Sequence, residues 1–287
     1  MKPLLRVEDL SVRFGGIMAL NKVNFEVAEG SITGLIGPNG AGKTTVFNCL
    51  TGFYRSQAGA ILLNGPHGDV NLSTLLGAKF RFDDLAQPAQ FFQKLYYGFF
   101  GGTHLVTRAG IARTFQNIRL FSEMSVLENL LVAQHLLVNR NIISGLFQLP
   151  SFRHAEEAAV DRAYRWLKTV KLEYYANHLA GSLSYGNQRR LEIARAMCTN
   201  PRLICLDEPA AGLNPKETRE LADLIRLLRE EHKATVLVIE HDMSLVMSIS
   251  DHIVVLNYGQ VIAADKPKAI QEHPKVLAAY LGTEAQA

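Results

Sequence analysis

Residues 37–45 of this chain read Gly37-Pro38-Asn39-Gly40-Ala41-Gly42-Lys43-Thr44-Thr45, which follows the pattern G-x-x-x-x-G-K-[ST] of a phosphate-binding loop. The glycines let the backbone fold tightly, so that several N–H groups converge on one anion. In such a loop Lys43 brings its ammonium group to the β- and γ-phosphates, and Thr44 offers its hydroxyl to Mg²⁺. The flanking residues predict a strand at 31–36 and a helix at 44–50 whose dipole adds to the site. We therefore expect the chain to bind a nucleoside triphosphate, rather than to form a glycine turn with an exposed lysine.

The composition limits the class of protein. With 287 residues, 48% of them hydrophobic, the chain can hold one large α/β domain with appendages or two modest domains. The net charge of +3, from 30 basic and 27 acidic residues, does not favour a nucleic-acid-binding protein. We find no internal repeat, no signal peptide and no apolar run of the ~18 residues that a membrane span needs. Three cysteines lack metal-ligand spacing and are expected to be buried, reduced thiols of a cytosolic protein: Cys49, Cys198 and Cys205.

Two short apolar runs, at residues 203–208 and 235–241, each end in polar side chains. Runs that are apolar on both faces suit a buried parallel sheet. Between them Asn214 is a good helix N-cap, and an apolar stripe follows it at Leu221, Leu224, Ile225 and Leu228. The predicted core is therefore strand–helix–strand, with polar chemistry at the carboxyl ends of the strands, where open α/β sheets bind ligands. Turns of the hairpin kind are predicted at 29–30, at 64–65, and at 257–260 between strands 253–256 and 261–264.

Asp207 and Glu208 end the first of these runs as neighbours. Adjacent residues of a strand point to opposite sides, so the two carboxylates can take different roles. Asp207 suits the coordination shell of Mg²⁺, usually through water, because it is a hard oxygen ligand. Glu208 suits a general base that polarises an attacking water. Without a phosphate loop upstream, the pair would more simply cap the helix that follows.

The middle of the chain is predicted to be a mostly helical subdomain. Helices are expected at 126–133 and 155–170, with Pro150 between them, and a third begins at Leu183-Ser184-Tyr185-Gly186-Asn187-Gln188 and stops at Asn200-Pro201. A serine at a helix start, with a glycine two residues later, makes a second possible anion site. Taken alone, Ser184 would be only an N-cap.

Taken in order, these motifs resemble the ATP-binding cassette (ABC) family. The family's phosphate loop corresponds to residues 37–45, its signature sequence to 183–188, and its magnesium strand with the catalytic glutamate to 203–208. Residues 211–214 correspond to the segment that crosses the dimer interface. The resemblance implies a single P-loop NTPase domain of the α/β class, with a RecA-like core sheet, an antiparallel β subdomain and an inserted α-helical subdomain.

The resemblance also gives roles to single residues. Phe14 corresponds to the aromatic residue that stacks on adenine, Gln116 to the glutamine that touches Mg²⁺ and the attacking water, and His241 to the switch histidine near the γ-phosphate. Glu208, His241 and Gln116 form the implied catalytic set, and Thr44, Gln116 and Asp207 hold Mg²⁺, partly through water. In this family two cassettes pack head to tail around ATP, which would bring the γ-phosphate to the partner's signature residues Ser184, Tyr185, Gly186 and Asn187.

Within the family the chain is most similar to LivG-type subunits of bacterial branched-chain amino-acid importers. The similar segments are 112–121, 191–196, 208–217, 239–243 and 279–282. Urea and short-amide importers and lipopolysaccharide-export cassettes share much of this pattern and remain alternatives. A cassette ATPase without a transport role is another alternative, although such proteins usually carry coiled coils, zinc sites or two fused cassettes. A GTPase would be expected to show an Asn-Lys-x-Asp segment, which is absent from the sequence.

The resemblance implies an ATPase with ATP and Mg²⁺ as its ligands, at the cytoplasmic face of the bacterial inner membrane. Its expected partners are a second cassette of the same or another chain, two integral membrane permease subunits and, indirectly, a solute-binding protein, but no nucleic acid. The surface from Gln116 to Glu128 resembles the groove that receives permease helices. The chain departs from the family pattern at Tyr185, which replaces a glycine, at Asn187, which replaces a glutamine, and at Asn214, which replaces an aspartate.

We expect one domain over residues 4–282. Its parts are a core with the β subdomain at about 4–65 and 200–265, an insertion at about 66–109, the helical subdomain at about 117–198 and a tail at 266–287. The insertion is too long for a hairpin loop and is rich in aromatic residues. We consider, in decreasing order of preference, a small subdomain with its own core, a surface for a permease or for self-association, and a disordered segment. The aromatic content disfavours disorder.

Overall fold

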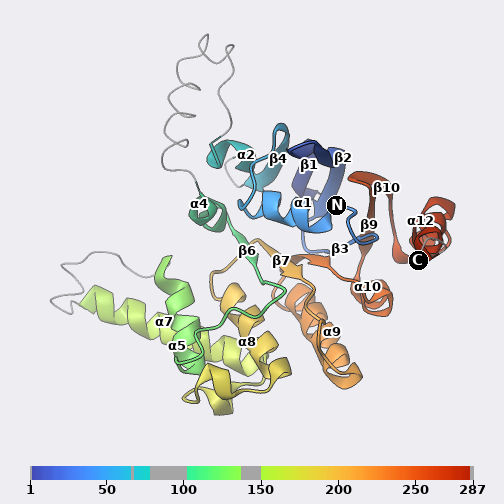
Figure 1. The fold of residues 1–287 in the computed structure, drawn as a ribbon. Coiled ribbons are helices and arrows are strands. Elements are labelled where there is room, and N and C mark those ends of the chain that lie inside the picture. Colours follow the sequence, from blue (N-terminus) through green and yellow to red (C-terminus); the bar gives the residue numbers. More distant parts are fainter. Residues whose placement is uncertain (1, 66–67, 78–101, 137–149, 285–287) are drawn as a thin grey trace, which may run out of the picture.

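The computed structural model describes residues 2–65, 68–77, 102–136 and 150–284. Two β-sheets and the helices around them make up the fold (Figure 1). This architecture confirms the α/β class and the antiparallel sheet expected from the sequence. Of the predicted insertion at 66–109, the aromatic part lies outside the described residues.

The first sheet is antiparallel and has the strand order β2-β1-β4-β5. Its strands are β1 (Pro3–Phe14), β2 (Ile17–Ala28), β4 (Ala58–Gly65) and β5 (Gly68–Asn71). Strands β4 and β5 form a hairpin, but Asn64 and Gly65 are paired with Asp69 and Gly68 as the last residues of β4, so the turn predicted at 64–65 was placed too early. The hairpin also shows that the start of the insertion extends this sheet, after which two short helices follow: α2 (Leu72–Leu75) and α4 (Thr103–Arg108).

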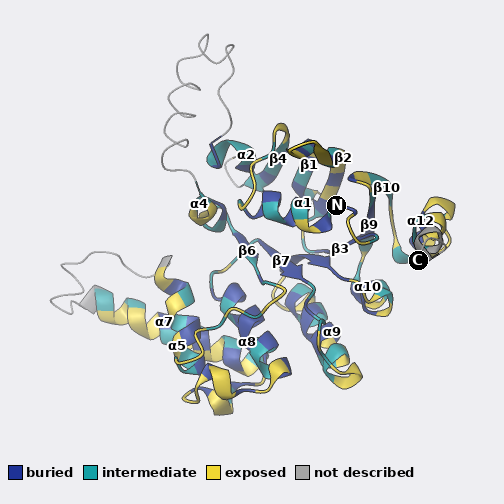
Figure 2. Ribbon diagram, viewed as in Figure 1, coloured by how far each residue is buried: buried dark blue, intermediate teal, exposed yellow. Residues whose placement is uncertain are grey.

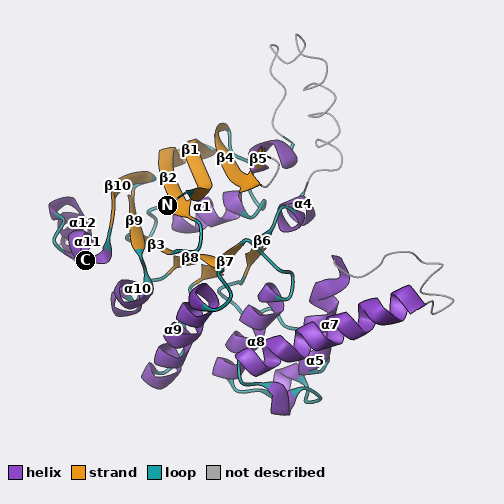
Figure 3. Ribbon diagram, turned by 180° about the vertical axis from the view of Figure 1, so that it is seen from behind, coloured by secondary structure: helices purple, strands orange, loops and turns teal. Residues whose placement is uncertain are grey.

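The second sheet has six strands in the order β10-β9-β3-β8-β7-β6 (Figure 3). Its central strands are buried along their whole length, whereas the edge strand β10 is partly exposed (Figure 2). Five neighbouring strands run parallel: β3 (Ile32–Ile36), β6 (Ile111–Arg113), β7 (Leu203–Asp207), β8 (Thr235–Ile239) and β9 (His252–Asn257). Strand β10 (Gln260–Asp265) pairs antiparallel with β9, which confirms the predicted hairpin. The turn at 29–30 was predicted as a hairpin, and this was wrong, because β2 and β3 belong to different sheets.

Helices fill the space between the sheets and cover the far face of the second one. Helix α1 (Lys43–Leu50) packs with residues of both sheets in one core cluster. A second cluster joins β7 and β8 to several helices, among them α5 (Val126–Ala133), α7 (Pro150–Thr169), α8 (Tyr185–Met197) and α9 (Pro215–Glu230). A third cluster packs β3 and β9 against α10 (Met243–Ile249), α11 (Pro267–Gln271) and α12 (Pro274–Glu284).

The starts of α9 and α7 and the end of β7 can each be compared with the sequence predictions. Asn214 caps α9, with a capping box to Glu217, and the stripe from Leu221 to Leu228 is buried as expected. Pro150 was expected to lie between the helices at 126–133 and 155–170, and it is instead the first residue of α7. This position suits proline because the first helical N–H has no partner within the helix. Strand β7 ends at Asp207, and Glu208 follows it with a left-handed φ of 46°. The prediction that both residues belong to the end of the strand is therefore wrong for Glu208.

Candidate functional site

The phosphate loop joins the end of β3 to the start of α1, and two of its glycines are required by their surroundings. At Gly37, which has a φ of 150°, an added Cβ would lie 2.1 Å from the carbonyl oxygen of Leu256 on β9. At Gly42, which has a φ of 102°, it would lie 2.8 Å from Cδ2 of Leu20 and 2.9 Å from the carbonyl oxygen of Ala19. The loop is therefore pressed against β2 and β9, and any side chain at these positions would displace it.

Lys43 is buried at the first position of α1, and its Nζ donates hydrogen bonds to two carbonyl groups of its own loop. The acceptors are Gly37 O at 2.6 Å and Pro38 O at 3.0 Å. Burial lowers the pKa of Lys43 below its ordinary value, and the nearby charge of Glu208 opposes this shift. These contacts hold the ammonium group inside the curve of the loop, where the motif needs it.

A pocket of about 420 Å³ opens beside this loop and collects several predicted site residues. Residues 39–45 line it together with Glu208 and His241. Ile17, Met18 and Ala19 from the start of β2 complete one wall, and Tyr258 and Gly259 from the β9–β10 turn complete another. Phe14 is not among the lining residues; it is 46% exposed, and its ring meets that of Tyr54 edge-on at a centroid distance of 5.2 Å.

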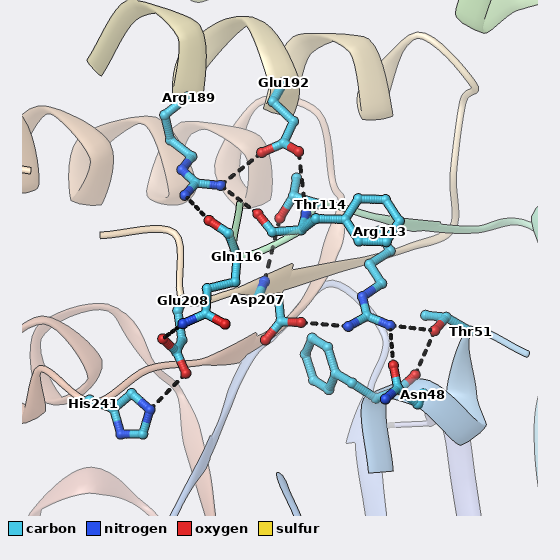
Figure 4. A network of polar contacts seen from close by, with 12 residues as sticks. Asn48, Thr51, Arg113, Thr114, Gln116, Arg189, Glu192, Asp207, Glu208 and His241 are labelled. Carbon is cyan, nitrogen blue, oxygen red and sulfur yellow. Dashed lines mark hydrogen bonds and ion pairs between the residues drawn. The ribbon is translucent and has the colours of Figure 1, made fainter. Parts of the chain in front are cut away.

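Glu208 is held between two side chains that come from other parts of the sheet (Figure 4). Gln116 Nε2, from the segment after β6, donates to Glu208 Oε2 at 2.8 Å. His241 Nε2, from the segment after β8, lies 2.7 Å from Glu208 Oε1. The structure therefore brings together all three residues expected to be catalytic, at the edge of the pocket that the phosphate loop lines.

Asp207 points away from Glu208 and toward Arg113, as Figure 4 shows. Its Oδ2 accepts a hydrogen bond from Arg113 Nη2 at 2.5 Å, and both side chains are almost fully buried. Arg113 Nη1 also donates to Asn48 Oδ1 at 2.7 Å and to Thr51 Oγ1 at 3.0 Å at the end of α1. This ion pair, which the sequence did not predict, connects β6, β7 and α1 behind the pocket.

Glu240 is a further buried carboxylate that the sequence analysis missed. Its Oε1 accepts a hydrogen bond from the N–H of Ala210 at 2.6 Å, and its Oε2 accepts one from the N–H of His241 at 3.0 Å. Burial raises the pKa of Glu240, and these backbone donors oppose the shift. Glu240 thus ties the segment after β7 to the segment after β8, which places Glu208 and His241 at the same point. The only sequence signal was an acidic residue directly before His241.

The signature residues lie at the start of α8 and none of them lines the pocket. Ser184 is the N-cap, and its Oγ accepts a hydrogen bond from the N–H of Asn187 at 3.4 Å. An added Cβ at Gly186 would lie 2.6 Å from Glu217 Oε1, so this glycine lets α8 approach the start of α9. Tyr185 is 43% exposed. Within one chain, the signature residues and the phosphate loop are thus separate.

The described residues contain no group of three or more His, Cys, Asp or Glu side chains that could hold a metal ion by themselves. This is compatible with Mg²⁺, which protein sites often bind through one or two side chains together with substrate phosphates. Thr44 is exposed and lines the same pocket as Glu208, and Gln116 lies next to Glu208, so suitable oxygen donors are present. None of the helices in the described part of the chain is long and apolar enough to cross a membrane.

The chain is similar to known proteins over nearly its whole length. A sequence model of the family described as ABC transporter matches residues 20–211, and one described as branched-chain amino acid ATP-binding cassette transporter matches residues 260–286. The chain is 51% identical over 281 residues to BraF of Pseudomonas aeruginosa, a high-affinity branched-chain amino acid transport ATP-binding protein, with 98% of each chain covered. It is 50% identical, with the same coverage, to LivG of Escherichia coli, which has the same description.

The solved structures agree in fold. An ATP-binding cassette of an ABC transporter, in its ADP conformation, matches with a TM-score of 0.74 and 31% identity, covering 98% of this chain and 100% of the other. A nucleotide-free ATP-binding cassette from an ABC transporter matches with a TM-score of 0.72 and 30% identity, covering 97% of this chain and 99% of the other.

Proposed function

This chain belongs to the ABC transporter family, and on that premise we propose that it is the ATP-hydrolysing subunit of a bacterial importer of branched-chain amino acids. The observation that carries the proposal is the position of Glu208. Its carboxylate lies between Gln116 and His241 at the pocket of the phosphate loop. The relatives at 50–51% identity, which are described as branched-chain amino acid transport ATP-binding proteins, support the substrate class.

In the proposed hydrolysis the protein positions ATP and the attacking water and stabilises the charge that develops on the phosphate. Residues 37–45 offer backbone N–H groups, and Lys43 offers its ammonium group, to the β- and γ-phosphates of ATP. Glu208 orients the attacking water and accepts its proton, while Gln116 and His241 fix the direction of the carboxylate. The charge that develops on the γ-phosphate is stabilised by Lys43 and His241, which line the same pocket. Phe14, beside the β1–β2 turn, provides the ring on which adenine stacks.

We assign the magnesium ligands to Thr44 and Gln116, with Asp207 reached through water. When bound, the ion would neutralise phosphate charge. Arg113 occupies Oδ2 of Asp207, so in this arrangement the carboxylate contributes to the ion at a distance. The Arg113 contacts to Asn48 and Thr51 fix Asp207 relative to α1 and therefore relative to Thr44 near the start of that helix.

The second half of the nucleotide site comes, in this proposal, from a partner cassette. The separation of Ser184 and Gly186 from the phosphate loop within one chain supports this arrangement. Two chains packed head to tail would each bring Ser184, Tyr185, Gly186 and Asn187 to the ATP on the other. ATP would then stabilise the closed dimer because its γ-phosphate contacts both chains, and ADP would release it. The tight approach of Gly186 to Glu217 fixes these residues for that contact.

The proposed docking surface for a permease runs from Gln116 to Glu128. Phe121 within it is 51% exposed, and Phe53 nearby in the fold is 50% exposed. Ser125 and Glu128 form a capping box at the start of α5, which keeps this edge ordered. We propose that two integral membrane permease subunits bind here, with a solute-binding protein acting through them, and that the cassette is thereby held at the cytoplasmic face of the inner membrane. The single cassette domain at 4–282 is part of the same proposal.

Reconstitution tests this function. Tagged protein is purified with its associated membrane subunits, and the complex is placed in liposomes with labelled leucine on the binding-protein side and ATP on the cassette side. The proposal expects leucine uptake that depends on ATP and is absent with the Glu208→Gln variant. Uptake of urea instead of leucine, extraction of lipopolysaccharide, or recovery without any membrane subunit would contradict it.

A further inference from the structure

Helix α8 carries a buried ion pair that takes no part in the assignments above. Arg189 Nη1 donates to Glu192 Oε2 at 2.8 Å, and both side chains are almost completely inaccessible to solvent. Burial raises the pKa of Glu192, and the adjacent charge of Arg189 opposes that shift. A buried ion pair adds little to stability compared with apolar side chains of the same volume, because both charges lose their hydration. A contribution to the fold alone therefore does not account for it.

The pair holds the backbone of the segment that contains Gln116, here called the Gln116 segment (residues 115–119). Arg189 Nη1 donates to the carbonyl oxygen of Phe115, and Arg189 Nη2 to that of Gln116, both at 2.7 Å. The N–H groups of Phe115 and Arg119 lie 3.3 and 3.4 Å from Glu192 Oε1, which accepts from them. Arg189 thus binds the carbonyl groups and Glu192 the N–H groups of one short segment, as Figure 4 shows in part.

The same segment positions the proposed base. The carbonyl oxygen of Gln116 is held by Arg189, and Gln116 Nε2 reaches Glu208 at 2.8 Å. The same Nη2 of Arg189 also donates to the hydroxyl of Tyr185 at 3.3 Å, and Tyr185 stands one residue after the N-cap of α8. A continuous series of hydrogen bonds therefore runs from the signature residues through Arg189 and Gln116 to Glu208.

We propose that Arg189 and Glu192 are positioning residues for hydrolysis, forming a clamp that fixes the Gln116 segment to the signature helix. This proposal rests on the proposed function. Through the clamp, a shift of α8 moves Gln116 and hence the direction of Glu208. Each chain would then sense, at its own nucleotide, whether its signature residues have engaged the nucleotide on the partner.

The test separates positioning from stability. Glu192→Gln removes the charge and leaves Arg189 buried without its partner, so this variant can fail to fold. The double variant Arg189→Met/Glu192→Leu removes both charges at similar volume, so that neither charge is left buried alone. It also removes the partners of four backbone groups, so its free energy of unfolding is measured beside its activity. The matched control is Asp223→Leu/Arg226→Met, which removes an ion pair of the same i,i+3 spacing from α9, away from the Gln116 segment.

Three quantities are measured in the presence of the partner cassette: kcat for ATP, the Kd for ATP, and the hydrogen–deuterium exchange of residues 115–119. For the double variant the proposal expects kcat to fall about ten- to hundred-fold, because the base is misplaced. It expects the Kd to stay within about three-fold, because Lys43 and the phosphate loop are untouched. Exchange at Phe115 and Arg119 should rise about ten-fold or more, since their N–H groups lose their acceptor. The control should match the wild type in all three.

Wild-type kcat and unchanged exchange in a stably folded double variant would overturn the clamp. A parallel loss of Kd and kcat that tracks a loss of stability would also overturn it, because that is the signature of a purely structural pair. The exchange measurement needs no hydrolysis. A wild-type chain without ATPase activity would therefore contradict the proposed function, while the exchange of residues 115–119 would still decide the clamp.

Discussion

Nε2 of His241 lies 2.7 Å from Oε1 of Glu208, although the two residues are 33 positions apart in the chain. The contact exists because β7 and β8 are parallel neighbours whose carboxyl ends meet at one edge of the sheet. Glu240 holds the two following segments together through the N–H groups of Ala210 and His241. Gln116, in the segment after β6, donates a further hydrogen bond to the carboxylate of Glu208. The carboxylate is therefore oriented by groups from three strands before any substrate binds.

Replacement of Glu208 by glutamine tests its role as the base. Glutamine has the same shape but cannot accept a proton, so we expect kcat for ATP to fall by at least about a hundred-fold, within the range for loss of a general base. Lys43 and the loop are unchanged, so ATP should still bind and hold the dimer closed. Steady-state hydrolysis and size-exclusion chromatography with ATP measure the two effects, and rapid hydrolysis by the variant would mean that another group is the base.

Gly42→Ala tests the packing of the phosphate loop. The new Cβ would collide with Leu20 and Ala19 and would also sit at a positive φ. Strain and overpacking together should lower the free energy of unfolding by about 3 kcal/mol and weaken ATP binding. Gly30→Ala is the matched control, because it has a φ of 69° with nothing within 4 Å of the added atom. It should cost only about 1 kcal/mol. Equal losses in urea unfolding would show that the loop relaxes freely.

The N-cap of α9 gives a prediction about stability. Asn214 Oδ1 accepts hydrogen bonds from the N–H groups of Lys216 and Glu217, both at 3.0 Å. Asn214→Ala should therefore lower the free energy of unfolding by about 1 kcal/mol. Asn214→Asp keeps the acceptor and, at the positive end of the helix dipole, should lie within about 0.5 kcal/mol of the wild type or above it. Urea denaturation of the three proteins makes the comparison, and a stable Asn214→Ala would show that the cap is replaceable.

The three cysteines give a prediction about pH. Burial raises the pKa of each thiol from 9.0 to about 12: Cys49, Cys198 and Cys205. Because the folded-state pKa lies above the unfolded value, the protonated thiols favour the folded chain below pH 9, and this contribution is lost between pH 9 and about 12. At about pH 8, iodoacetamide should alkylate the native chain far more slowly than the urea-unfolded chain. Rapid labelling of the native protein would show that the thiols are accessible.

The sequence predicted most of the core because its signals are local. The apolar runs that become β7 and β8 and the N-cap at Asn214 depend on neighbours a few residues away, and all three are confirmed. The turn after Glu29 failed for the opposite reason. A turn motif shows that the chain reverses, but whether the next strand joins the same sheet depends on distant partners, here β8 and β9.

The main residues of the site could be predicted from the sequence, but the ion pairs and hydrogen bonds that hold them in place could not. Motif order indicated Gln116, Glu208 and His241, whereas Arg113, Glu240 and the Arg189–Glu192 pair were missed. On a helix, an arginine and a glutamate three residues apart usually form a solvated surface pair. Only the fold shows that this pair is buried against Phe115. The same holds for Arg113, whose partner Asp207 is 94 positions away.

The joint site between two chains is tested most directly by sedimentation of the Glu208→Gln chain with its partner cassette, at increasing concentrations of ATP and Mg²⁺. We expect ATP to drive association into a cassette dimer. We further expect Ser184→Glu in both chains to abolish this association, while the ATP affinity of each separate chain is kept. Undiminished association with Ser184→Glu present in both chains would contradict a nucleotide held jointly by the two cassettes.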